Sequence, residues 1–356
     1  WFNYCRPDYI NCLIMLKKMI SVLIILIVSG FIVAIPMYFL DFSQTDINWG
    51  VTFSPYYAQD ELGLDWRETY LAILDDLKID HLRLSAYWNR IEPQPDKYDF
   101  SDLDWQINEA AKRQVKIILA VGRKLPRWPE CHDPSWLKSL TDKEAQQKQL
   151  SYLEAVIKRY NNNPNIIIWQ IENEPFLKLF GQCPPFDKNF LYQEIALAKK
   201  LTQKPIMVTD SGELNWWVEA AKTKADIVGT TLYRMVYNKY VGYIPYVLPP
   251  AFYRGKGDLI AKLFKTQEVI IAELQAEAWH VEGKTLKDMA KEETDQSLSL
   301  RQFKKNLLFA RRSGAKSIYL WGVEWWYYLK KDRQDDSFWQ AAKTLWPQPL
   351  PTTNEE

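Results

Sequence analysis

Eight short apolar segments, each followed by an amphipathic stretch, constrain the fold of this chain more than any other feature of its sequence. The predicted strands cover Gly50 to Ser54, His81 to Ser85, Lys116 to Val121, Asn165 to Ile171, Pro205 to Thr209, Asp226 to Thr231, Glu268 to Ala272 and Ser317 to Trp321. The predicted helices cover Trp66 to Leu77, Leu103 to Arg113, Asp142 to Tyr160, Phe190 to Thr202, Trp216 to Lys222, Leu259 to Lys265, Leu298 to Arg312 and Phe338 to Leu345. Alternation of this kind is typical of parallel strands. It predicts an α/β fold, a closed (β/α)8 barrel; an open doubly wound sheet is the alternative, although no Gly-rich turn follows the first strand.

A long apolar run precedes the predicted barrel. Residues 19–40 carry no charged side chain, and a helix of this length could cross the roughly 30 Å hydrocarbon layer. Lys17 and Lys18 precede the run, so the positive-inside bias places the N-terminus in the cytoplasm. The predicted order is a cytoplasmic stub (1–18), a transmembrane signal-anchor helix in the lipid bilayer (19–40), a barrel domain outside the cytoplasm (41–346) and a loose tail (347–356). We therefore expect the protein at the cell membrane; a cleaved signal peptide is the alternative and would export the same domain.

Cys131 and Cys183 both fall in the domain predicted to be exported. Disulfides persist in oxidising compartments, so these cysteines could form one bridge, although two separate thiols are the alternative. The three histidines, His81, His132 and His280, are scattered without the spacing of metal ligands. We expect no metal site and no cofactor.

Two predicted strands run into glutamates. The fourth strand leads to Glu174 and the seventh to Glu273. Because parallel strands of a closed barrel end at one mouth, the two carboxylates could face each other there. Glycoside cleavage uses such a pair, one carboxylic acid to protonate the leaving oxygen and one carboxylate to attack or stabilise the sugar cation. Helix caps or solvated loop charges are the alternative interpretation.

The sequence around these glutamates resembles the clan A glycoside hydrolases, a group of retaining (β/α)8 enzymes that includes families 5, 39 and 42. Asn173, Glu174 and Pro175 form the Asn-Glu-Pro motif of that clan. Further similarity lies in the second strand with its loop and at the end of the eighth strand, at Arg83 to Asp104 and Trp321 to Trp325. The resemblance implies that Glu174 is the general acid/base and Glu273 the nucleophile.

The resemblance also implies roles for other residues. Asn173 would hydrogen-bond the sugar 2-hydroxyl, and Arg83 would keep Glu273 ionised. Tyr233 would donate a hydrogen bond to the nucleophile, and Trp321 would form a platform under the reacting sugar. A structural ion pair is the alternative for Arg83, and core packing for Trp321.

Further residues near the predicted mouth could contact substrate. Glu172 and Glu324 are interpreted as hydrogen-bonding support, and Glu277 is the main competitor of Glu273 for the role of nucleophile. Nine of the 16 tryptophans fall in predicted strand-end loops, where they could stack on sugar rings: Trp88, Trp128, Trp136, Trp216, Trp217, Trp279, Trp321, Trp325 and Trp326. A membrane-facing aromatic belt is the alternative.

The resemblance leaves the family open. Family 5 enzymes commonly carry histidines near the ends of strands three and six, where this chain has Arg123 and Tyr233, whereas Glu273-Leu274-Gln275 is similar to the Glu-x-Gln of family 42. A net charge of +1 gives no basic footprint for nucleic acid. We predict a retaining glycosidase that cleaves β-linked oligo- or polysaccharides, of the cellulase, β-glycanase or β-glycosidase type. A transglycosylase on the same site and a non-catalytic, membrane-tethered carbohydrate-binding protein are the alternatives.

Overall fold

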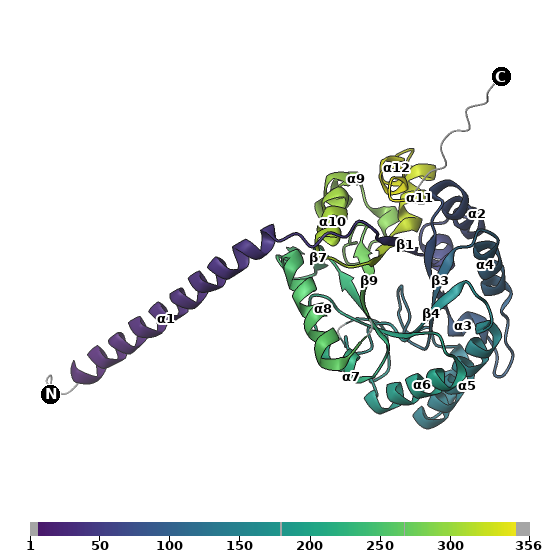
Figure 1. Ribbon diagram of the computed structural model, residues 1–356, viewed down its shortest axis with the longest axis horizontal. Helices are drawn as coiled ribbons and strands as arrows, with labels where there is room; N and C mark the ends of the chain where they lie inside the picture. The colour runs from purple at the N-terminus through teal and green to yellow at the C-terminus, as the bar shows by residue number, and fades with distance from the viewer. Residues whose placement is uncertain (1–5, 179, 267, 347–356) are drawn as a thin grey trace, which may run out of the picture.

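Eight parallel strands close into a barrel in the spatial order β1-β10-β9-β6-β5-β4-β3-β2 (Figure 1). The computed structural model describes residues 6–178, 180–266 and 268–346. The barrel strands are β1 Asn48–Thr52, β2 His81–Ala86, β3 Lys116–Val121, β4 Ile166–Ile171, β5 Ile206–Asp210, β6 Ile227–Leu232, β9 Glu268–Gln275 and β10 Ser317–Trp321. The predicted (β/α)8 barrel is therefore confirmed.

Most barrel strands are buried on both faces. Every residue of β2, β5 and β6 is buried, as expected for parallel strands whose outer face is covered by helices and whose inner face fills the barrel. The ends of the barrel strands were predicted to within one or two residues, except at β9. This strand continues three residues beyond Ala272, so Glu273 lies within the strand and not after it.

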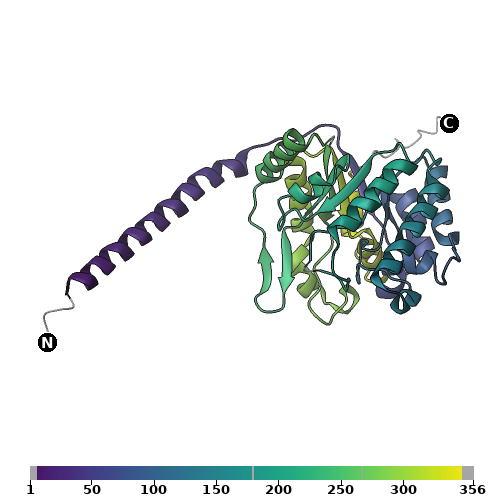
Figure 2. The same ribbon diagram turned by 90° about the horizontal axis from the view of Figure 1, so that it is seen from below.

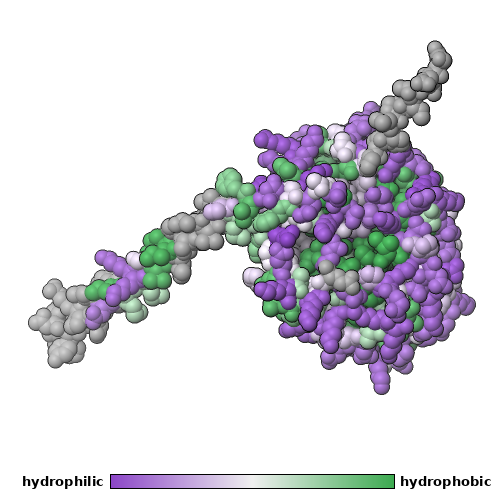
Figure 3. Space-filling view, viewed as in Figure 1, coloured by the Kyte–Doolittle hydropathy of each residue, from purple (hydrophilic) through white to green (hydrophobic). Residues whose placement is uncertain are grey.

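Helices surround the barrel as a ring (Figure 1). They are α2 Trp66–Ala72, α3 Trp88–Ile91, α4 Ser101–Lys112, α5 Asp142–Tyr160, α6 Lys188–Leu201, α7 Val218–Lys222, α8 Pro250–Phe264, α9 Lys291–Leu298, α10 Leu300–Arg312, α11 Val323–Asp332 and α12 Ser337–Lys343, with short π-helical turns η1 Tyr57–Glu61 and η2 Ile73–Leu77 and 3-10 turns η3 Ser135–Ser139 and η4 Leu286–Asp288. The predicted helix from Leu259 was too short, because α8 already begins at Pro250, a residue favoured in the first turn. On the face shown in Figure 3, hydrophilic residues cover the ring of helices and hydrophobic residues gather at its centre.

A two-stranded hairpin interrupts the alternation after β6. Its antiparallel strands are β7 Met235–Asn238 and β8 Gly242–Pro245, in a segment where no strand was predicted. β8 begins directly after the turn at Gly242, whose φ of 78° is a backbone conformation that favours glycine. Because the hairpin takes up β7 and β8, the next barrel strand beside β6 is β9. Figure 2 shows the two hairpin strands lying side by side.

A 34-residue helix, α1 Arg6–Phe39, projects from the barrel (Figures 1 and 2). The segment after it is held by α10, where Arg312 donates to the carbonyl of Leu40 at 3.1 Å and accepts from the backbone N–H of Phe42 at 3.2 Å. Among the residues that the structure describes, no helix combines the length and the apolar character needed to cross a membrane, so the transmembrane helix predicted at 19–40 is not supported. Residues 1–5 of the predicted stub and the predicted tail 347–356 lie outside the described residues.

Candidate active site

A cavity of about 570 Å³ opens where the barrel strands end. Its walls come from the ends of seven strands or the loops that follow them, represented by Ser54, Arg127, Glu174, Ser211, Tyr233, Glu273 and Trp321. Both glutamates singled out in the sequence line this one cavity. It therefore lies at the face of the barrel where (β/α)8 enzymes carry their active sites.

Glu273 projects from β9 and receives a hydrogen bond on each carboxylate oxygen. The guanidinium of Arg83 donates to Oε1 at 2.9 Å, and the hydroxyl of Tyr233 donates to Oε2 at 3.1 Å. Arg83 is completely buried in the barrel. Glu273 is therefore ion-paired with a buried cation. The structure thus brings these three predicted residues together.

Arg83 also orients Asn173. Its Nη2 donates to Asn173 Oδ1 at 2.7 Å, and the hydroxyl of Thr209 donates to the same oxygen at 3.2 Å. Because the oxygen is held by these donors, the amide Nδ2 is left as the group that can donate. Nδ2 has no hydrogen-bond acceptor among the described residues, and Asn173 lines the cavity. The side chain is therefore arranged to donate to a bound ligand.

Glu174 is in a different environment from Glu273. Its backbone adopts a left-handed conformation with φ of 42°, and its N–H donates to the hydroxyl of Thr209 at 2.8 Å. Within the described part of the chain, its carboxyl group makes no hydrogen bond. Burial, followed by the negative charges of Glu273 and Glu130, raises the pKa of Glu174 well above its ordinary value. The cavity therefore holds one carboxylate stabilised by a cation and one carboxyl group that favours its protonated form.

Arg127 occupies a second charged cluster in the cavity wall. Its guanidinium makes a bidentate ion pair with Glu277 and donates to Glu324 at 2.8 Å. The group also lies 3.7 Å from the ring centre of Tyr57 and 4.1 Å from that of Trp321. Glu277, the competitor for the role of nucleophile, is thus ion-paired with Arg127, and Glu324 accepts a hydrogen bond from the same guanidinium.

The predicted aromatic contacts divide into two groups. Trp128, which is 64% exposed, and Trp279 and Trp321 line the cavity. Trp88 does not, and its predicted contact with substrate is wrong. Its indole is fully buried, stacks on Tyr152 at 5.2 Å and lies outside the cavity, because α3 turns it into the core.

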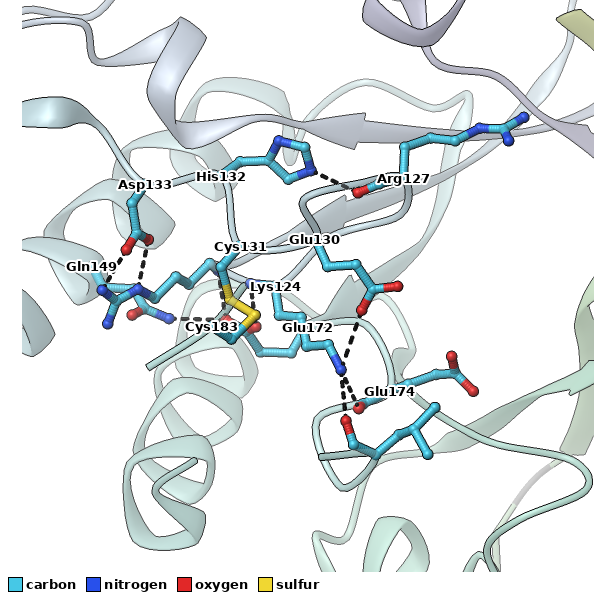
Figure 4. Close-up of a disulfide and its surroundings, with 12 residues drawn as sticks. Lys124, Arg127, Glu130, Cys131, His132, Asp133, Gln149, Glu172, Glu174 and Cys183 are labelled. Carbon is cyan, nitrogen blue, oxygen red and sulfur yellow. Dashed lines mark hydrogen bonds and ion pairs between the residues drawn. A yellow bond between two sulfur atoms is a disulfide. The ribbon is translucent and has the colours of Figure 1, made fainter. Parts of the chain in front are cut away.

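The loop after β3 is joined to the loop after β4. Cys131 and Cys183 form a disulfide with a Cα–Cα distance of 5.2 Å (Figure 4). Glu172 is buried, and its carboxylate accepts hydrogen bonds of 2.6 Å from the backbone N–H groups of Arg123 and Lys124. Glu172 thus anchors a loop and does not line the cavity.

Sequence reasoning missed several residues of the site, among them Arg127, Glu213 and Lys124. Glu213 lines the cavity and accepts hydrogen bonds from the backbone N–H of Tyr233 at 2.9 Å and from the hydroxyl of Tyr253 at 2.7 Å. Its position just after the fifth predicted strand was a signal that could have identified it. Lys124 contacts main-chain carbonyls, and such contacts leave no pattern in a sequence. Within the described part of the chain, no three His, Cys, Asp or Glu side chains are grouped to hold a metal ion.

Comparison with known proteins concerns the fold and the family of the chain. Residues 57–204, less than half of the chain, match the family model of glycoside hydrolase family 42, described as beta-galactosidase. No curated protein matches the chain.

Three solved structures illustrate the fold similarity. A family 5 protein (GH5_18) from Streptomyces cattleya, in complex with GlcNAc, superposes with a TM-score of 0.56 at 12% identity, covering 78% of this chain and 70% of that one. Xylanase 10B from Thermotoga maritima gives 0.54 at 14% identity, with 78% and 83% covered. A beta-galactosidase from Rahnella sp. R3 gives 0.50 at 12% identity, with 79% and 51% covered. The family match and the shared fold together support a clan A glycoside hydrolase of unassigned family, and hence a glycosidase.

Proposed function

We propose that this chain is a retaining glycosidase that cleaves β-linked O-glycosidic bonds, with Glu273 as the nucleophile and Glu174 as the general acid/base. The observation that carries this proposal is the contrast between two carboxyl groups in one cavity. Glu273 is paired with a buried guanidinium, whereas Glu174 has no hydrogen-bonded partner among the described residues and a raised pKa. A carboxyl group whose pKa is raised, beside a carboxylate that is ion-paired with a buried cation, is the arrangement expected of a general acid and its partner nucleophile.

The proposed reaction has two displacements. In the first, a carboxylate oxygen of Glu273 attacks the anomeric carbon while the bond to the leaving oxygen breaks and Glu174 gives its proton to that oxygen. In the second, Glu174, now a carboxylate, takes a proton from water as the water oxygen attacks the same carbon. The ester to Glu273 breaks, and both residues return to their starting states.

The surrounding residues support this mechanism. Asn173 has an amide N–H group free to donate to the sugar 2-hydroxyl, a contact that strengthens as the ring becomes cationic. The hydroxyl of Tyr233 donates to Oε2 of Glu273, and the guanidinium of Arg83 donates to Oε1. The two donors together fix the orientation of the carboxylate. Trp128, Trp279 and Trp321 provide flat apolar surfaces for sugar rings, so we expect an oligo- or polysaccharide substrate.

The first substrates to test follow from the comparisons. The matching family is described as beta-galactosidase, and the structural neighbours include xylanases. Aryl β-galactosides and β-xylosides should therefore be screened first, followed by other aryl β-glycosides, β-glucan and β-mannan.

The test is azide rescue of two alanine variants on an accepted aryl β-glycoside. Glu273→Ala should nearly abolish turnover, and added azide should restore part of it as a glycosyl azide of inverted configuration, because azide attacks the substrate directly. Glu174→Ala should instead give a glycosyl azide of retained configuration, because azide attacks the covalent intermediate. Glu277→Ala is the matched control and should give no glycosyl azide. Full activity of Glu273→Ala, or an inverted azide product from Glu277→Ala, would contradict the assignment.

We further propose that the barrel works outside the cytoplasm. The bond between Cys131 and Cys183 supports this, because disulfides persist in oxidising compartments. The location at the cell membrane stays a prediction. Fractionation of cells that express the full chain tests both. We expect the barrel in the exported fraction with Cys131 and Cys183 unreactive to alkylation. Free thiols at these two positions on a cytoplasmic protein would refute the proposal.

A further inference from the structure

Lys124 is a buried lysine whose ammonium group is turned toward the loop after β4 (Figure 4). Its Nζ donates to the carbonyl oxygen of Glu174 at 3.1 Å and to that of Leu177 at 2.9 Å. A carboxylate oxygen of Glu130 lies 3.3 Å away. Lys124 does not line the cavity, so it acts on the site through the chain and not on a ligand.

The main chain of Glu174 needs such support. A φ of 42° is sparsely populated by residues other than glycine and persists where the surroundings hold it. The N–H of Glu174 is held by the hydroxyl of Thr209, and its carbonyl is held by Lys124. These two contacts fix the peptide groups on both sides of the Glu174 side chain, which extends away from the ammonium group (Figure 4).

The loop that carries Lys124 is itself fixed. Lys124 and Cys131 pair as an antiparallel bridge, and Cys131 is bonded to Cys183 in the loop after β4. The N–H of Gln182 also donates to the carbonyl of Pro129 at 2.9 Å. The bridge closes the loop after β3 on itself, and the disulfide and the Gln182 hydrogen bond tie that loop to the loop after β4 at two places. The ammonium group is thereby held against the main chain of the proposed general acid.

We propose that Lys124 is a positioning residue for the general acid, which directs the Glu174 side chain by holding its carbonyl oxygen. This inference rests on the proposed function, since it matters only if Glu174 delivers the proton. A lysine that merely satisfies buried carbonyl groups would affect every substrate alike. A lysine that aims the acid affects only those substrates whose leaving group needs a proton.

The experiment compares two β-glycosides of one accepted sugar, a dinitrophenyl glycoside, whose leaving group departs without a proton, and an alkyl glycoside, whose leaving group requires one. Lys124→Met keeps the approximate length of the side chain but removes its hydrogen-bond donors. In this variant, kcat/KM for the alkyl glycoside should fall by about 10²-fold, which is the effect expected when a catalytic group is misplaced. The kcat/KM for the dinitrophenyl glycoside should change little.

Lys204→Met is the matched control. Lys204 also donates through Nζ to a main-chain carbonyl, that of Asn163, but both residues precede their strands and so lie at the opposite end of the barrel. The ratio of the two kcat/KM values should be unchanged in this variant.

A change of protonation would not mimic the expected loss. Burial and Glu273 dominate the raised pKa of Glu174, and the charge of Lys124 acts in the opposite direction. Its removal would raise the pKa of Glu174 further and keep the acid protonated.

Equal losses on both substrates, or no loss on either, would overturn the inference. If near-UV circular dichroism shows that Lys124→Met does not fold, Lys124→Arg carries the test, because it keeps the charge but places a bulkier group against the Glu174 carbonyl. The same selective loss is expected there, and its absence overturns the inference. The Glu174→Ala variant separates the two proposals. If this variant does not lose more kcat/KM on the alkyl glycoside than on the dinitrophenyl glycoside, the proposed role of Glu174 fails. If Glu174→Ala shows that selective loss and the Lys124 variants do not, only the present inference is overturned.

Discussion

Asp210 should make the stability of this protein decrease as the pH rises from acid to neutral. It ends β5 with 1% of its surface exposed, and its Oδ1 accepts hydrogen bonds from the N–H of Ser211 at 2.9 Å and the amide of Asn215 at 2.6 Å. Burial raises the pKa of Asp210 from 3.8 to about 6. Between about pH 4 and about pH 6, the folded protein therefore keeps a proton that the unfolded chain has released.

The magnitude follows from the shift. A difference of about two pKa units corresponds to about 3 kcal/mol of unfolding free energy, which is present below about pH 4 and fully lost above about pH 6. Asp210→Asn keeps the shape of the side chain and the accepting oxygen but cannot ionise. The variant and the wild type share every other titratable group, so the difference between them reports the ionisation of Asp210 together with its effect on the pKa values of Glu174 and Lys256.

Urea unfolding followed by tryptophan fluorescence measures the effect. The stability of Asp210→Asn relative to the wild type should rise by about 3 kcal/mol from about pH 4 to about pH 7. Asp99→Asn is the control, because hydrogen bonds from Ser101 lower the pKa of the exposed Asp99, so its ionisation affects stability mainly below about pH 4 and the difference between this variant and the wild type should be nearly constant from about pH 4 to about pH 7. A difference between Asp210→Asn and the wild type that is constant across this pH range would refute the reasoning.

Further predictions concern the cavity and its walls. Asn173→Ala should lower kcat/KM by about 10²-fold on ordinary glycosides but have little effect on a glycoside that lacks the 2-hydroxyl, since the lost contact is the one to that group; equal effects on both would contradict this role. Arg127→Met should reduce the unfolding free energy by about 3–5 kcal/mol in urea titrations, because it leaves the buried carboxylates of Glu277 and Glu324 without their cation. Trp128→Ala should raise KM without changing the urea midpoint, whereas Trp88→Ala should cost about 3–5 kcal/mol of stability, and the reverse pattern would place Trp88 in contact with substrate.

The architecture was predictable from the sequence because strands buried on both faces are continuous apolar runs. The predicted strand at 116–121 matches β3 to the residue. The end of β9 was not predictable in this way, since Glu273 and Gln275 are polar residues inside a strand. Gln275 is fully buried because its side-chain oxygen accepts from the N–H groups of Arg234 and Met235, contacts that depend on the position of another loop.

The site was predictable where side chains contact one another and much less where they contact the main chain. The resemblance led to Arg83 and Tyr233 around Glu273, and the structure brings the three together. Lys124 was missed because its partners are carbonyl groups, which every residue has. Trp88 was misplaced because proximity to a strand end does not tell on which side of a short helix the ring will lie.

The bond between Cys131 and Cys183 turns the segment between them, including α5, β4 and Glu174, into a covalent ring. A protease that cuts any loop inside this ring leaves both fragments attached, so a nicked molecule migrates as an intact chain on a gel without reductant. The proposed acid would remain tethered beside its partner carboxylate in such a molecule. Thiol treatment after the cut would release it, and the two gels run side by side would reveal how much of a preparation is broken.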